Sequence, residues 1–157
     1  MSEFKFTKEN EKKFEELLLR YPKRASLTLP SLWMVQYQEG WISQDAMIYI
    51  ADKLETTPMD IQSIASFYTM FNLKPIGKYN IQVCKTLSCK LCGSEEIRSH
   101  LQKKLGIRFG ETTKDMKFTL TQVECLGACG EAPAMSFNDD YIGDLTIDKI
   151  DKILDEL

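Results

Sequence analysis

Residues 77–92 read GKYNIQVCKTLSCKLC, and this stretch marks a change in the pattern of the chain. Tyr79, Ile81 and Val83 alternate with polar residues and then with Cys84, which is the period of a β-strand that buries one face. We expect the strand to bury the first three side chains and to turn Cys84 to the opposite face. A cysteine-rich loop follows the strand, so the chemistry predicted here is sulfur chemistry.

Before this strand the apolar residues recur at helical spacing. The sequence predicts a helix that Thr7 caps and Pro22 stops, and a short helix after Pro30. Ser43 caps a third helix, and residues 57–60, TPMD, start a fourth with a cap, a first-turn proline and an acidic third residue. Four successive helices predict a small helical bundle.

Beyond the first strand the pattern predicts both helices and strands. A helix begins near Ser94 and ends at Gly106, two strands follow around residues 118–124 and 134–138, and Thr146 starts a closing helix. A helical half followed by this mixed half places the chain in the α+β or α/β class.

Length and composition agree with two small units. The 157 residues divide into a predicted N-terminal helical domain, residues 1–76, and a predicted mixed domain, residues 77–157. The net charge of −3 lacks the basic excess typical of nucleic-acid binding, so we expect no nucleic-acid partner. No apolar run has the length of a bilayer span and the N-terminus lacks a signal-peptide core, so we expect a cytoplasmic chain with no direct membrane insertion.

The small numbers of histidines and cysteines limit the kinds of metal site that this chain could form. The one histidine, His100, excludes Rieske-type ligation and zinc sites that need two histidines, and we expect it to be structural. An odd number of cysteines in a reducing compartment favours metal or redox chemistry over structural disulfides. The five cysteines lie within 46 positions of the second half: Cys84, Cys89, Cys92, Cys125 and Cys129.

Two pairs stand out among these cysteines. Four residues separate Cys84 from Cys89, three separate Cys125 from Cys129, and each pair lies where a predicted strand runs into a loop. Two such loops side by side present four thiolates, which suit either tetrahedral zinc or a 2Fe-2S cluster. The spacing alone leaves both metals open.

The residues around the pairs favour the cluster. Small residues let backbone N–H groups approach the sulfurs, and hydroxyl groups add further donors that stabilise the negative charge added on reduction. These residues are Gly127, Ala128, Gly130, Ala132, Thr86 and Ser88.

Several stretches together carry a family resemblance. They are IQSIASFYTMF at 61–71, GKYNIQV at 77–83, VCKTLSC at 83–89, ECLGAC at 124–129 and NDDY at 138–141. In this order they resemble the thioredoxin-like 2Fe-2S component, known as the E subunit, of respiratory NADH:quinone oxidoreductase. The resemblance covers nearly the whole chain, from about Phe14 to the last helix.

The resemblance implies a thioredoxin-like second domain with one 2Fe-2S cluster held by Cys84, Cys89, Cys125 and Cys129. It also implies a flavin- and NADH-binding partner subunit, which holds FMN and NADH and exchanges single electrons with the cluster. This chain is then a non-catalytic electron-transfer subunit of a multi-subunit NADH dehydrogenase, peripheral to the inner membrane through the complex. The absence of a G-x-G-x-x-G or Walker-type loop from the sequence is compatible with that division of labour.

Other assignments stay open. The same module resembles subunits of NAD(P)-linked hydrogenases and of NAD-linked formate dehydrogenases. From different classes, a structural zinc module fits the four cysteines, and a thiol-disulfide oxidoreductase fits the C-x-x-C formed by Cys89 and Cys92. Genes adjacent to this one distinguish the complexes, and colour distinguishes iron from zinc.

Cys92 is a departure, because the family pattern does not require it. Cys84, Cys89 and Cys92 also match plant-type ferredoxin spacing. Neither that pattern nor the C-x-x-C uses the second pair at Cys125 and Cys129, so we expect Cys92 to be a partly buried residue outside the ligand set.

Two further expectations concern Pro133 and the end of the fourth helix. The resemblance to thioredoxin-like folds implies that Pro133 takes the place of their cis-proline beside the active site, so we expect a cis peptide bond before it. Aromatic residues at helical spacing are usually core, and four apolar residues at the end of the fourth helix are expected there: Phe67, Tyr68, Met70 and Phe71.

Overall fold

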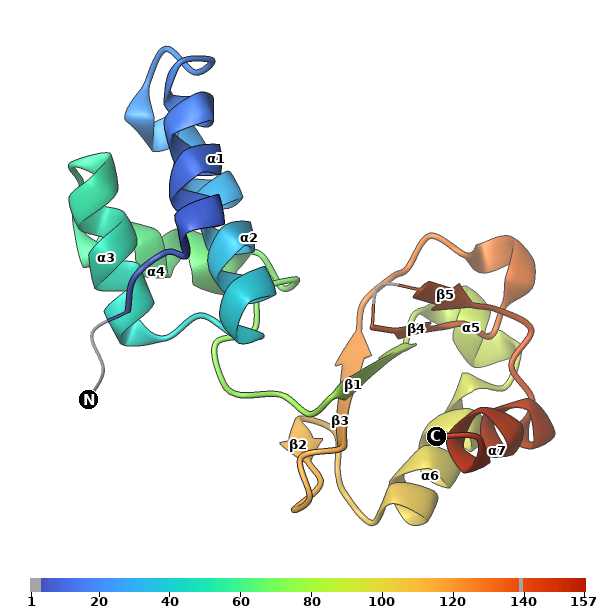
Figure 1. The fold of residues 1–157 in the computed structure, drawn as a ribbon. Coiled ribbons are helices and arrows are strands. Elements are labelled where there is room, and N and C mark those ends of the chain that lie inside the picture. Colours follow the sequence, from blue (N-terminus) through green and yellow to red (C-terminus); the bar gives the residue numbers. More distant parts are fainter. Residues whose placement is uncertain (1–3, 139) are drawn as a thin grey trace. The chain divides into compact units, whose positions relative to one another are not determined.

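The computed structural model describes residues 4–138 and 140–157 (Figure 1). The chain divides into two compact units between Pro75 and Ile76. Each unit has its own hydrophobic core. Asp139, which belongs to the 138–141 stretch of the family resemblance, lies outside the described residues, as do residues 1–3 at the N-terminus.

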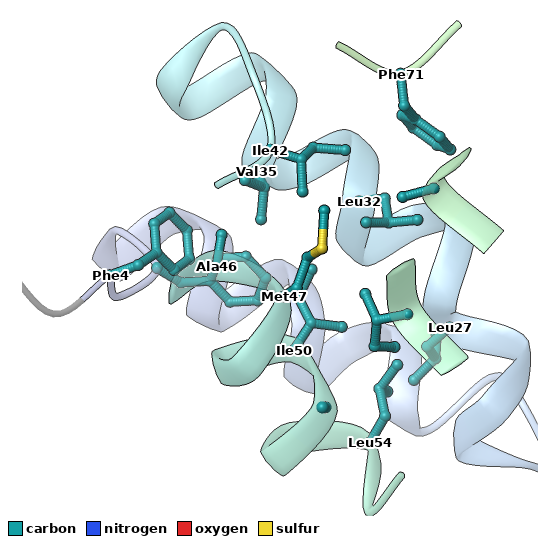
Figure 2. Close-up of a cluster of buried hydrophobic side chains, with 14 of the residues drawn as sticks. Phe4, Leu27, Leu32, Val35, Ile42, Ala46, Met47, Ile50, Leu54 and Phe71 are labelled. Atoms are coloured by element: carbon teal, nitrogen blue, oxygen red, sulfur yellow. The ribbon is translucent and has the colours of Figure 1, made fainter. Parts of the chain in front are cut away.

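The first unit is helical, as predicted. Its elements are α1 (Lys8–Leu18), a 3₁₀ turn η1 (Arg24–Leu27), α2 (Thr28–Glu39), α3 (Gln44–Leu54) and α4 (Pro58–Phe67). Figure 2 shows side chains of α2 and α3 meeting in the core of this unit, where Leu32, Val35 and Ile50 are fully buried.

Three of these helices begin at the predicted capping residues. The hydroxyl groups of Thr7 and Ser43 each accept a hydrogen bond from the backbone N–H three residues later. At α4, Thr57 and Asp60 form a reciprocal capping box, in which each side chain accepts from the other residue's backbone N–H. Local hydrogen bonding therefore fixes where the helices start.

Some boundaries differ from the predictions. The second helix begins at Thr28, before Pro30, because a proline in the first helical turn loses no hydrogen bond. The first helix ends at Leu18 and does not reach Pro22. The loop predicted around Cys89 is a short helix.

The expectation of core positions at the end of α4 is wrong for three of the four residues. Only Phe71 is buried, whereas Phe67, Tyr68 and Met70 are exposed. The helix ends at Phe67, and Tyr68 is extended, with φ −89° and ψ 107°. Helical spacing therefore stops there, and the chain turns only Phe71 inward.

The second unit is a mixed sheet with helices. Its elements are β1 (Tyr79–Cys84), α5 (Leu87–Leu91), α6 (Ser94–Leu105), β2 (Glu111–Thr112), β3 (Phe118–Val123), a 3₁₀ turn η2 (Cys129–Glu131), β4 (Met135–Phe137), β5 (Asp140–Ile142) and α7 (Ile147–Asp155). The sheet order is β2-β3-β1-β4-β5, and β1 pairs with β3 in parallel while the other pairs are antiparallel. The predicted fold class is confirmed, although the short strands β2 and β5 were not predicted.

The two faces of β1 pack into different clusters. Ile81 and Val83 are fully buried in the cluster that also contains Leu101 of α6 and Ile150 of α7. Cys84 points into a separate small cluster. The predicted burial is confirmed for Ile81 and Val83, whereas Tyr79 packs against the same cluster but is only partly buried. Helices α6 and α7 share the apolar side of the sheet. Among the described residues no helix has the length and apolar character needed to cross a membrane.

Gly77 supports the entry into β1 and generates a prediction. Its N–H donates to the hydroxyl of Thr119 at 2.6 Å, and a Cβ at this position would lie 2.9 Å from backbone atoms of Lys117 and Phe118. Gly77→Ala forces these backbones apart, so we expect a loss of about 1–3 kcal/mol in the free energy of unfolding, measured by urea denaturation. Gly130→Ala, where the added Cβ meets nothing within 4 Å, is the control, and equal stability of both variants would contradict this packing argument.

Candidate metal centre

The two cysteine-bearing segments leave the sheet side by side. Because β1 and β3 run parallel with Cys84 opposite Val123, both strands end at the same edge. The chain continues from β1 into α5, which contains Cys89, and from β3 into the loop that begins with Cys125. Strand pairing thus brings together segments about forty residues apart in the sequence.

Residues next to the cysteines connect the two segments. The backbone N–H of Lys85 donates to the carbonyl of Val123 at 3.0 Å, and the Lys85 ammonium lies 2.6 Å from a carboxylate oxygen of Glu124. A partly exposed ion pair contributes at most about 1 kcal/mol, so its effect is mainly on position. We did not predict this pair, although opposite charges directly after Cys84 and before Cys125 were a usable signal.

Cys84 and Cys89 form a buried pair. Each side chain is only 2% exposed, and both pack with Ala134. The Cys84 sulfur lies 3.2 Å from the hydroxyl of Thr86, and the Cys84 thiol donates to the carbonyl of Glu124 at 3.5 Å. The expected hydroxyl donor at Thr86 is therefore in contact with a predicted ligand sulfur.

The surroundings shift the pKa values of this pair in opposite directions. Burial opposes ionisation of Cys84, but hydrogen bonds from the hydroxyl and backbone N–H of Thr86 and from Cys89 act against burial and help to hold the pKa of this thiol below its ordinary value. The backbone N–H of Leu126, in the second cysteine loop, acts in the same direction. Burial raises the pKa of Cys89, and the adjacent Cys84 and the charge of Cys129 raise it further. Both cysteine segments therefore act on the same pair of sulfurs.

Cys125 and Cys129 lie on the exposed side of the site. The backbone N–H of Gly127 donates to the Cys125 sulfur at 3.3 Å. Gly127 has φ +75°, a left-handed conformation that a residue without Cβ adopts without strain. The loop ends at Ala132 and Pro133, and the predicted cis peptide bond between them is present.

The four predicted ligands thus form one buried pair and one exposed pair on adjacent segments. Within residues 4–138 and 140–157, no three or more cysteine, histidine or acidic side chains gather closely enough to hold one metal ion. A 2Fe-2S cluster takes its thiolates as two pairs, one at each iron. Two thiol pairs with backbone and hydroxyl donors beside their sulfurs provide the donor set that this group requires.

Cys92 is exposed, so the expectation of partial burial is wrong. It follows the last residue of α5, where the chain turns away at Gly93 with φ +92°. Its side chain lines a cavity of about 280 Å³ with residues from the starts of α6 and α7, and it lies outside the cluster formed by Cys84 and Cys89.

His100 has the structural place expected for it. Its Nε2 lies 2.7 Å from a carboxylate oxygen of Asp151, which also accepts from the Lys104 ammonium at 2.8 Å. These contacts connect α6 with α7 and involve none of the cysteines.

Several proteins of known identity are similar to this chain. The E subunit of the NADH-quinone oxidoreductase of Rickettsia felis is 47% identical over 98% of this chain and 93% of its own length. The corresponding protein of Rickettsia bellii is 46% identical over 100% of this chain and 96% of its own. The mitochondrial NADH dehydrogenase [ubiquinone] flavoprotein 2 of Dictyostelium discoideum is 48% identical over 98% of this chain and 64% of its own.

A solved structure and a family model also match this chain. The crystal structure of an NAD⁺-reducing [NiFe]-hydrogenase in the air-oxidised state superposes with a TM-score of 0.74 at 22% identity, over 83% of this chain and 22% of the hydrogenase chain. That likeness establishes the fold. The sequence model described as thioredoxin-like [2Fe-2S] ferredoxin matches residues 14–157, nearly the whole sequence. This chain therefore belongs to the thioredoxin-like [2Fe-2S] ferredoxin family.

Proposed function

We propose that this chain is the electron-transfer subunit of an NADH:quinone oxidoreductase and binds one 2Fe-2S cluster. The main support for the proposal is the position of the two cysteine pairs. They lie where two neighbouring parallel strands, β1 and β3, end at the same edge of the sheet. Near-full-length similarity to proteins named as the E subunit of this complex supports the assignment. Residues 1–76 and 77–157 are proposed as its helical and cluster-binding domains.

The proposed ligands are Cys84, Cys89, Cys125 and Cys129. When bound, a 2Fe-2S cluster accepts and returns one electron at a time. The hydroxyl of Thr86 lies beside the Cys84 sulfur, so it is placed to donate once that thiol loses its proton on binding a metal. Donors of this kind stabilise the negative charge that reduction adds.

The two pairs have different solvent environments, and this difference suits a subunit that works with a partner. The buried pair at Cys84 and Cys89 keeps water from one side of the site. The exposed pair at Cys125 and Cys129 leaves the other side open. The proposed partner is the flavin- and NADH-binding subunit, which holds FMN and NADH, so this chain is non-catalytic by itself. It is then cytoplasmic and reaches the inner membrane only through the complex.

The alternative of thiol-disulfide exchange fits these residues less well. Burial raises the pKa of Cys89, whereas a nucleophilic redox cysteine requires a lowered pKa. Its potential partner Cys92 is exposed and lies outside the buried cluster of Cys84 and Cys89. The second cysteine pair also has no role in a dithiol reaction.

Reduction by NADH tests the proposed function. We expect the cluster-loaded chain mixed with the flavin-bearing subunit to develop a reduced-cluster electron-paramagnetic-resonance signal when NADH is added. The chain alone with NADH is the control, and it should stay silent. A mixture that binds but is not reduced by NADH would contradict the proposal.

Cysteine substitutions distinguish ligands from the extra cysteine. Cys84→Ser and Cys125→Ser each remove a proposed ligand, so we expect loss of iron or an altered absorption spectrum in anaerobically purified protein. The matched control is Cys92→Ser, which should keep the iron content and spectrum of the unaltered chain. Loss of iron in Cys92→Ser, or full retention in Cys125→Ser, would overturn the ligand assignment.

A further substitution tests the hydroxyl donor. Thr86→Val keeps the shape of the side chain but removes the group 3.2 Å from the Cys84 sulfur. Because the reduced site is more negative, we expect a more negative reduction potential in a spectroelectrochemical titration, with iron retained. Thr86→Ser keeps a hydroxyl and should stay near the unaltered potential. An unchanged potential in Thr86→Val would show that this hydroxyl does not stabilise the reduced state.

A further inference from the structure

The outer side of α4 is an exposed apolar surface. Met59 and Phe67 are 70% and 77% exposed, and Ser63 and Ser66 lie between them on the same helical face. Opposite them, Ile61 is buried where α4 packs against α2 and α3. We define the α4 surface as Met59, Ser63, Ser66, Phe67, Tyr68 and Met70.

Charged side chains are scarce around the α4 surface. The exposed carboxylate of Asp60 lies at its N-terminal end, where it takes part in the capping box of α4. Residues 61–73 include no charged side chain, although 27% of the whole chain is charged. Residues 25–38 are uncharged as well. They contribute Tyr37, which is 72% exposed and stacks on Trp33 with ring centroids 5.2 Å apart. Two uncharged stretches therefore contribute to one region of the first unit.

Aromatic contacts connect these stretches. The ring of Trp33 lies 5.3 Å from that of Phe71, Phe71 lies 6.5 Å from Tyr68, and Tyr68 lies 5.1 Å from Phe67. The exposed rings are thus continuous with the buried core. Protein interface cores have the same composition, being enriched in aromatic residues and methionine and depleted of charge.

The serine hydroxyls of the α4 surface already form hydrogen bonds. The Ser63 hydroxyl donates to the carbonyl of Asp60 at 2.8 Å, and the Ser66 hydroxyl donates to the carbonyl of Ser63 at 3.0 Å. Removing water from these side chains therefore leaves neither hydroxyl without a partner. The small serines also allow close approach of another chain between Met59 and Phe67.

Hydrogen bonds within the chain hold the segment after α4 in place. The side-chain amide of Gln36 donates to the carbonyl of Met70 at 2.9 Å, and its oxygen accepts from the backbone N–H of Asn72 at 2.6 Å. A second contact joins the Asn72 side chain to the carbonyl of Gly40 at 3.1 Å. An ordered surface loses less conformational entropy on binding.

We propose that the α4 surface docks onto an apolar face of the flavin- and NADH-binding subunit, an inference that rests on the proposed function. Residues 61–73 offer no counter-charge, so a charge that a partner placed against Phe67, Tyr68 or Met70 would lose its water without compensation, which is unfavourable. The part of the matching face that covers these three residues must therefore be uncharged. Proteins similar to this chain are named as subunits of a multi-subunit oxidoreductase, which favours a different subunit over a second copy of this chain.

Exposed substitutions on one helix test this docking. The cluster-loaded full chain is titrated against the purified flavin-bearing subunit, and Phe67→Ser and Met59→Ser are each expected to weaken the affinity roughly tenfold or more. The control is Leu19→Ser, which removes an equally apolar side chain, 90% exposed just beyond α1, and should leave the affinity unchanged. Because the altered side chains are exposed, iron content and thermal midpoint should match those of the unaltered chain.

The possible results distinguish a failure of the docking proposal from a failure of the proposed function. Equal affinity of the α4 variants and the unaltered chain would overturn the docking while leaving the proposed function in place. An unaltered chain that does not bind the flavin-bearing subunit would overturn both. Self-association of the unaltered chain that Phe67→Ser abolishes, with binding to the flavin-bearing subunit unaffected, would assign the surface to a second copy and overturn the proposed partner.

Discussion

Parallel pairing of β1 with β3 is the constraint on which the site depends. Cys84 stands opposite Val123, so both strands end at one edge and release their cysteine segments together. A slip of one residue would turn Cys84 into the apolar face that Ile81 and Val83 occupy. Burial of that face against α6 and α7 therefore fixes the register, and the register fixes the position of the sulfurs.

The unequal exposure of the two cysteine pairs follows from this arrangement. Cys84 ends a central strand and is covered by Ala134, whereas Cys125 and Cys129 lie in the loop beyond β3. A site closed on one side and open on the other suits one-electron exchange with another protein. The apolar α4 surface adds a second region suited to contact with that protein, so both units take part in the proposed assembly.

Short-range hydrogen bonding made the starts of the helices predictable from the sequence. Thr7, Ser43 and Thr57 cap their helices because each hydroxyl accepts from a backbone N–H within one turn. The exposure of side chains that depends on tertiary context was not predicted. Phe67 lies on the face of α4 opposite the buried Ile61, whereas Tyr68 and Met70 lie beyond the end of that helix. Cys92 lies exposed at the end of α5. The ends of these two helices are not encoded in apolar periodicity.

The ligand set was reached by family resemblance, since cysteine spacing by itself leaves zinc and iron open. The most direct measurement is an absorption and electron-paramagnetic-resonance spectrum of the anaerobically purified chain, with iron and sulfide counted before and after dithionite. The account predicts two irons and two sulfides per chain and a signal that appears only on reduction. Bound zinc, or a colourless chain without metal, would contradict it.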